Sequence, residues 1–136
     1  MIPLHPAVVH YPIGLLSAAL LFYVLYAWTG REAFRTAGWY GHGLGLLGVV
    51  AAIVSGIAAR SGVADRVDPT WLDRHQTLGM GTGVYFLLVW LIFLQRPLWL
   101  RRRGIVTALA LIGWGLLLAT ARYGHFLVWR FLVLEK

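Results

Sequence analysis

The sequence contains no cysteine and little charge, and each shortage removes whole classes of protein. Without cysteine the chain cannot form disulfides, thiolate metal sites, iron–sulfur clusters or covalently attached c-type haem. Charged residues make up only 12% of its 136 residues, against roughly a quarter in an ordinary soluble domain. With 60% apolar residues and a mean hydropathy of +0.73, the composition indicates a membrane protein.

Four long stretches carry no Asp, Glu, Lys or Arg at all: residues 1–30, 36–59, 75–95 and 104–121. A helix crosses the hydrocarbon core with about 20 apolar residues, within a range of roughly 17–25. We therefore expect an all-α fold, a single four-helix transmembrane bundle over residues 1–136 with up-down-up-down topology. Its spans are predicted at about 7–29, 38–59, 75–95 and 104–121.

Local signals mark two of the expected helix starts. Asp68-Pro69 is typical of a helix N-terminus, with aspartate as the N-cap and proline at the first helical position. Pro6 fits the first turn of the first span, whereas Pro12 is expected to bend or restart that helix. The N-terminus lacks the basic segment that opens a signal peptide, so this span is expected to be retained.

Basic residues favour the cytoplasmic side of a membrane and so orient the chain. None precedes the first span, whereas the connections after the first and third spans contain Arg31, Arg35, Arg96, Arg101, Arg102 and Arg103. The opposite side also has six basic residues, namely Arg60, Arg66, Arg74, Arg122, Arg130 and Lys136, but there Asp65, Asp68, Asp73 and Glu135 dilute them. We predict a multi-pass protein of the bacterial inner membrane with both termini outside. Because most basic residues flank the spans, the net charge of +7 is expected to contact membrane lipids and not nucleic acid.

Four of the five histidines fall at one end of the predicted bundle and come from three separate stretches. His5 and His10 open the first span, His75 opens the third, and His125 follows the fourth. His42 opens the second span at the other end, and for this residue a structural role is favoured. A histidine is costly inside hydrocarbon, so each one there is by default a functional-site hypothesis.

The third span leaves room for a flat ligand beside its histidine. Gly79 and Gly83 follow His75 at four-residue spacing and therefore share its helical face. Two neutral imidazoles from different helices of a bundle can fill both axial positions of a haem iron. The sequence therefore predicts a b-type haem site at this end.

The predicted axial pair is His10 and His75, because they come from different helices and both are followed by membrane-embedded helix. His5 and His125 are the second choices. Nearby arginines are expected to pair with the haem propionates through charge-assisted hydrogen bonds; these are Arg74, Arg122 and Arg130.

Two other interpretations stay open. Clustered imidazoles also suit zinc, copper or a proton-linked role, and histidines at an interface can serve only to hydrogen-bond backbone carbonyls and lipid head groups. Gly41 and Gly45 form a small-xxx-small pair that is typical of close helix packing. Glycine-rich helix faces of this kind allow a scaffold or accessory subunit that docks other helices or a second copy of the chain.

The sequence offers little for a self-sufficient enzyme. No span contains paired carboxylates, and there is no Ser/His/Asp set, phosphate-binding loop or nucleotide fingerprint. At most we expect an electron carrier that acts as a subunit or partner of a larger redox complex.

The opening segment His5-Pro6-Ala7-Val8-Val9-His10-Tyr11-Pro12-Ile13-Gly14 resembles the start of the bacterial predicted membrane proteins grouped as domain of unknown function 2231. Ser55-Gly56 resembles the small-Gly pair that ends that family's second helix, and His75 falls where the family has a histidine opening its third. The segment from Gly124 to Arg130 resembles the family's closing motif. The resemblance covers essentially the whole chain and implies no established activity. Since some relatives are joined to Rieske-type or cytochrome modules, it implies a link with electron transfer.

Overall fold

The computed structural model describes residues 4–95, 100 and 102–129. These residues form five helices: α1 (Leu4–Val8), α2 (His10–Thr29), α3 (Glu32–Val63), α4 (Pro69–Gln95) and α5 (Arg103–Leu127). Because α1 and α2 are separated only by Val9, they make one continuous span, Leu4–Thr29. This span and the three other helices are all long and apolar enough to cross a membrane. The predicted all-α four-helix bundle is confirmed.

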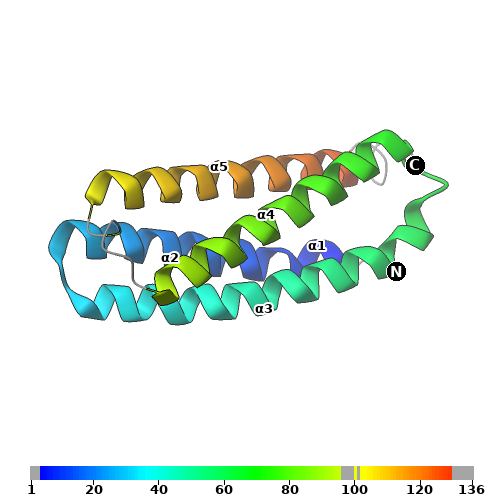
Figure 1. Cartoon of the computed structure of the whole chain (residues 1–136). Helices are drawn as coiled ribbons and strands as arrows, with labels where there is room; N and C mark the ends of the chain where they lie inside the picture. The colour runs from blue at the N-terminus through cyan, green and yellow to red at the C-terminus, as the bar shows by residue number, and fades with distance from the viewer. Residues whose placement is uncertain (1–3, 96–99, 101, 130–136) are drawn as a thin grey trace.

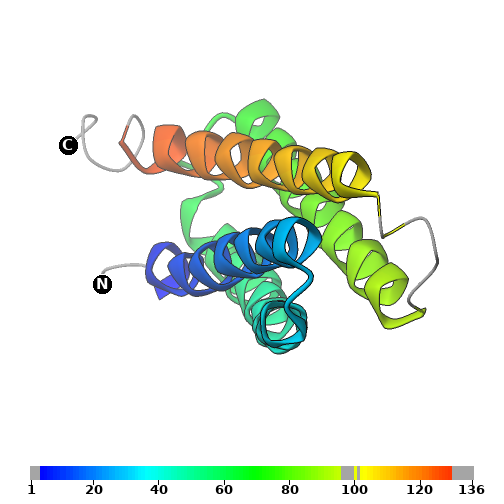
Figure 2. The same cartoon turned by 90° about the vertical axis from the view of Figure 1, so that its left-hand side faces the viewer.

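Successive spans run in opposite directions, which gives the predicted up-down-up-down topology (Figure 1). The start of α1, the end of α3, the start of α4 and the end of α5 therefore lie together, at a place we term the histidine end. Helix α4 crosses the bundle obliquely (Figure 2). Its start packs on the end of α5 through Trp71 and Tyr123, and its far end packs on the start of α3 through Trp90 and Trp39.

Short polar signals set the helix boundaries. The backbone N–H of Thr70 donates a hydrogen bond to Asp68 Oδ1 at 2.8 Å, as expected for the N-cap of α4. Gly30 ends α2 with a φ of 70°, a left-handed conformation that glycine adopts without steric cost. Helices α3 and α5 run beyond the charge-free stretches, because α3 begins at Glu32 and α5 continues to Leu127.

The glycine-rich face of α3 is covered by α2 within the same chain. A Cβ at Gly45 would lie 2.6 Å from Leu16 Cδ2, and a Cβ at Gly41 would lie 3.8 Å from Ala19 Cβ. The contact between α2 and α3 is also the most extensive helix pairing in the bundle. The small-xxx-small pair seen in the sequence therefore serves packing inside the chain.

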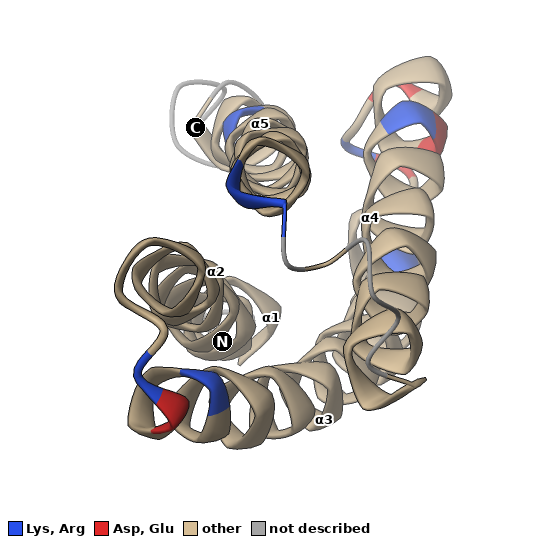
Figure 3. Ribbon diagram, turned by 60° about the vertical axis from the view of Figure 1, so that its left-hand side comes forward, with Lys and Arg blue, Asp and Glu red and all other residues tan. Residues whose placement is uncertain are grey.

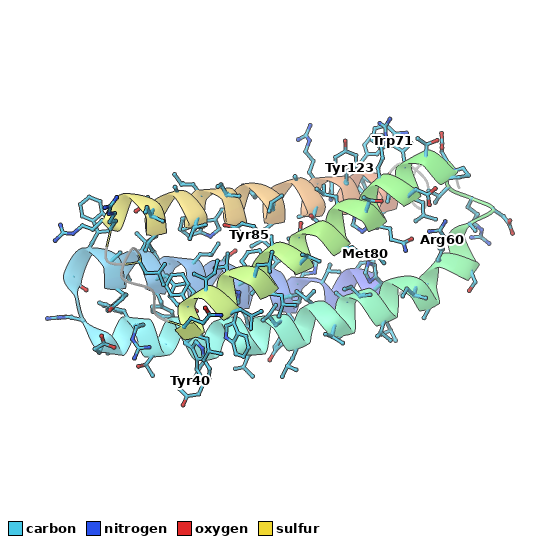
Figure 4. All side chains as sticks on the ribbon, viewed as in Figure 1. Tyr40, Arg60, Trp71, Met80, Tyr85 and Tyr123 are labelled. Carbon is cyan, nitrogen blue, oxygen red and sulfur yellow. The ribbon has the colours of Figure 1, made fainter. Side chains whose placement is uncertain are left out.

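The distribution of side chains fits a membrane-spanning bundle. Charged residues lie toward the helix ends and leave the lengths between them uncharged (Figure 3). Tyr23, Phe86 and Leu16 are fully buried in the core between the helices. Tyr40 lies near one end of the bundle, and Trp71 and Tyr123 lie at the histidine end (Figure 4), as expected for aromatic residues at two membrane interfaces.

Candidate functional site

A cavity of about 540 Å³ lies at the histidine end of the bundle. Residues from all five helices form its wall, which is mainly apolar with a few histidine, threonine, glutamine and arginine side chains. Pockets for small molecules and cofactors span about 300–1,000 Å³ and have this mixture of apolar wall and sparse polar groups. The cavity is therefore of a size and character suited to an organic ligand.

All four histidines that the sequence places at this end line the cavity. His5 and His75 are half-buried and face each other, with ring centres 6.3 Å apart and ring planes at 74°. His10 and His125 are exposed, and Nδ1 of His10 donates a hydrogen bond to the carbonyl of Pro6 at 2.6 Å. The structure thus places His5 next to His75. His10, which the sequence favoured as the partner of His75, is an exposed residue of the cavity wall.

A serine of α3 sets the protonation of the His5 ring. Ser55 Oγ donates its proton to the carbonyl of Ala52 at 3.1 Å, so it must accept in its contact with His5 Nδ1 at 3.0 Å. Nδ1 of His5 therefore carries the proton, and Nε2 keeps a free lone pair. Metal-binding histidines have the same arrangement, in which the second ring nitrogen donates to a fixed acceptor.

Glycines of neighbouring helices accommodate both imidazole rings. A Cβ at Gly124 would lie 2.9 Å from Cε1 of His75, and a Cβ at Gly56 would lie 3.0 Å from Cε1 of His5. Nδ1 of His75 is buried without a hydrogen-bond partner among the described residues, and the backbone of Thr120 lies beside the same ring. Any larger residue at either glycine would displace the ring that it supports.

The strip predicted beside His75 faces the cavity. Gly79 and Gly83 both line it on α4, together with His75. A Cβ at Gly79 would meet Thr120 at 3.8 Å, and a Cβ at Gly83 would meet Val49 at 3.0 Å. The two glycines therefore let Val49 of α3 and Thr120 of α5 pack close to α4 at the cavity wall.

Two threonines join α4 to α5 at the cavity wall. Thr82 Oγ1 donates to the carbonyl of Leu78 at 2.8 Å, so in its contact with Thr120 Oγ1 at 2.9 Å it acts as the acceptor. Hydroxyl pairs of this kind hold membrane helices together because both polar groups are satisfied inside the protein. The distance between the two helices at the cavity is thereby fixed.

Two of the three arginines predicted to bind propionates do not line the cavity. Arg74 and Arg122 are exposed and are not part of its wall. The guanidinium of Arg74 stacks over the ring of Trp71, 5.9 Å from its centroid. Arg130 lies outside the described residues.

Arg60, at the end of α3, lines the cavity instead. One guanidinium nitrogen donates to Gln76 Oε1, and another donates to Asp73 Oδ1 at 2.8 Å. Figure 4 shows Arg60 at the histidine end, close to the start of α4. Sequence reasoning missed this residue, although its four-residue spacing from Gly56 places both on one face of α3.

The described residues contain no group of three or more His, Cys, Asp or Glu side chains that could hold a metal ion. Zinc sites use four protein ligands when structural and three when catalytic. The facing imidazoles of His5 and His75 therefore suit a metal whose other ligands come from a bound molecule.

His42 lies outside this site. It is fully buried, with its ring centre 5.8 Å from that of Tyr23 and 5.5 Å from that of Phe86. It is not one of the residues that line the cavity. Its surroundings are those of a side chain packed in the core between helices.

Fold and site together define a four-span membrane protein with an imidazole-lined cavity at one end. A family model described as "Predicted membrane protein (DUF2231)" matches residues 1–136. The chain belongs to this family, as its opening motif indicated. No curated protein and no solved structure matches the chain.

Proposed function

We propose that the protein binds b-type haem in this cavity and carries electrons. The observation that supports this function is the 6.3 Å between the ring centres of His5 and His75. Bonds from a metal to imidazole nitrogen are about 2.0–2.1 Å long, so two imidazoles on opposite sides of one ion have ring centres roughly 6 Å apart. At this spacing the imidazoles of His5 and His75 would hold one iron between them.

Haem suits this pair better than a bare ion does. A porphyrin brings four nitrogen ligands, so the protein needs to supply only the axial positions. His5 and His75 would hold the iron of such a cofactor, whereas zinc would require at least one further protein ligand. Gly79 and Gly83 line the same cavity as His75, whose volume of about 540 Å³ is within the range of cofactor pockets.

The chain's own residues would orient the cofactor and tune it. Ser55 holds His5 with Nε2 free for the metal, and Gly56 and Gly124 support the two imidazole rings. The apolar wall lowers the local polarity, which together with axial-ligand identity sets the reduction potential of a haem. When bound, haem supplies one-electron chemistry that no side chain here provides.

The orientation in the membrane is assigned from the arginines at the two ends of the bundle. Arg60, Arg66, Arg74 and Arg122 lie at the histidine end, where Asp65, Asp68 and Asp73 accompany them. Arg31, Arg35, Arg102 and Arg103 flank the bundle end opposite the cavity, while Arg96 and Arg101 lie outside the described residues. Under the positive-inside rule this end faces the cytoplasm. The proposed haem then lies near the outer face of the bacterial inner membrane, where a redox complex or a soluble carrier can reach it.

The absorption spectrum of the detergent-purified protein tests the proposal. Wild-type protein should show a Soret band and, after reduction, split α and β bands. We expect His5→Ala and His75→Ala to lose this spectrum, and His10→Ala and His125→Ala, which change exposed histidines of the same cavity, to keep it. If the Soret band is kept in His5→Ala and lost in His10→Ala, the haem ligand is His10 and not His5.

A further inference from the structure

Arg60 is the one arginine among the described residues that line the cavity. We infer that Arg60 binds the acidic group of the cavity's ligand and thereby fixes which edge of that ligand points out of the cavity. This inference rests on the proposed function, in which the ligand is haem b and the acidic groups are its propionates.

The guanidinium has donors to spare. Arginine carries five N–H donors, and two of them are used by Gln76 and Asp73. Carboxylates are the groups that a planar guanidinium binds best, often through two parallel hydrogen bonds. Arg60 can therefore donate hydrogen bonds to a ligand carboxylate and keep its hydrogen bond to Gln76.

The ion pair with Asp73 positions the Arg60 guanidinium and leaves some of its N–H donors free. The side chains of Arg60 and Asp73 are 43% and 60% exposed, and ion pairs exposed to this degree contribute little to stability. Both groups belong to the histidine end, where α3 ends and α4 begins. A carboxylate arriving from the cavity side can thus join or replace Asp73 at low cost.

The position of Arg60 relative to the histidines suits one orientation of the ligand. Arg60 follows Ser55, the partner of His5, by five residues, which is about 7.5 Å farther along α3 toward the membrane surface. In haem b both propionates extend from one edge of the ring. With the iron held by His5 and His75, binding of the propionates by Arg60 would turn that edge toward the surface and leave the apolar edge deeper in the bundle.

Titration with two porphyrins tests the role of Arg60. Iron protoporphyrin IX and its dimethyl ester differ only in whether the two carboxylates are free, and Soret absorbance reports the binding of each. Wild-type protein should bind the free acid about tenfold or more tightly than the ester, since one charge-assisted hydrogen bond corresponds to that ratio. Arg60→Gln should reduce this preference to less than about threefold while the Soret band stays in place.

Matched variants separate the role of Arg60 from general effects. Arg60→Lys, which keeps the charge, should retain part of the preference, and Arg66→Gln, at an exposed arginine of the same end outside the cavity wall, should retain all of it. If wild type shows no preference, or Arg60→Gln keeps the full preference, the role of Arg60 is overturned while haem binding stands. If neither porphyrin binds to wild type, the proposed function itself fails.

Discussion

At the scale of single residues, the site depends on how one hydroxyl orients one imidazole. Ser55 accepts from His5 Nδ1 because its own proton is already donated to the carbonyl of Ala52. This leaves His5 in the tautomer that binds a metal through Nε2. Nδ1 of His75 has no hydrogen-bond partner within the described part of the chain. Substitution of Ser55 is therefore the way to measure how much a hydrogen bond to the imidazole contributes to ligand binding.

Replacing Ser55 with alanine should weaken haem binding by about 10- to 100-fold, the usual effect of removing a group that orients a metal-binding histidine. The measurement is a haem titration followed at the Soret band. Ser61→Ala is the matched control, because Ser61 Oγ also donates to a carbonyl of its own helix, that of Ala58 at 3.3 Å, and is exposed. Equal affinities for the two variants would contradict the role given to Ser55.

Two tyrosines in the bundle differ in whether their hydroxyl group forms a hydrogen bond. Tyr23 is buried and its Oη has no hydrogen-bond partner among the described residues, whereas Tyr85 Oη donates to the carbonyl of Leu109 at 2.5 Å. An unsatisfied buried polar group costs about 1–3 kcal/mol, and a satisfied hydrogen bond contributes about 1 kcal/mol. Tyr23→Phe should therefore raise the thermal unfolding midpoint in detergent, and Tyr85→Phe should lower it. A lower unfolding midpoint for Tyr23→Phe would contradict this prediction, because it would mean that the Tyr23 hydroxyl forms a stabilising hydrogen bond.

The sequence placed four histidines at one end of the bundle but did not give the pairing of their rings. That His5, His10, His75 and His125 share one end follows from span topology alone, which hydropathy predicts well. Which two rings meet depends on how the helix turns between His5 and His10, at the break around Val9, and on which glycines of other helices accommodate them. Those contacts come from tertiary packing, so the sequence could not show which ring lies beside that of His75.

At the scale of helices, the close approach of α2 and α3 is the feature most sensitive to mutation. A Cβ at Gly45 would lie 2.6 Å from Leu16, far inside a normal contact. Gly45→Ala should destabilise the protein by about 1–3 kcal/mol, the typical cost of overpacking a core. The measurement is thermal unfolding of the purified protein.

Gly81→Ala is the control for this prediction. Gly81 is exposed on α4, and a Cβ there would meet nothing within 4 Å. Alanine at such a position should be neutral or stabilise the helix by up to about 1 kcal/mol. If Gly45→Ala instead dissociated an oligomer and left the unfolding midpoint unchanged, α3 would be docking another chain as well as α2.

The number and approximate positions of the membrane-spanning helices could be predicted from the sequence, whereas the residues at which each helix begins and ends were harder to predict. Charge-free stretches gave the membrane-embedded cores, but α3 extends from Glu32 to Val63, beyond the charge-free residues 36–59. The start of α4 at Pro69 was predicted from its capping residue and not from hydropathy. Polar residues continue a helix as readily as apolar ones when a cap is present, as Asp68 shows at α4. Hydropathy marks where the hydrocarbon lies, whereas capping residues mark where a helix begins.

At the scale of the whole molecule, the site's access to partners depends on which end faces outward. The chain has no cysteine, so single introduced thiols report topology without background. Ala64 and Ala33 are both exposed and lie at opposite ends of α3. In intact cells a membrane-impermeant maleimide should label the Ala64→Cys variant and leave the Ala33→Cys variant unlabelled until the membrane is opened. The reverse pattern would place the cavity on the cytoplasmic side.

The most direct test of the whole account is the haem and iron content of the protein purified from its membrane, measured together with its reduced-minus-oxidised spectrum. The pairing of His5 and His75 across the cavity predicts haem in an amount equal to that of the chain, with the narrow α band of iron that has an imidazole on each side. A colourless protein that contains no iron and gains no Soret band when haem is added would contradict it.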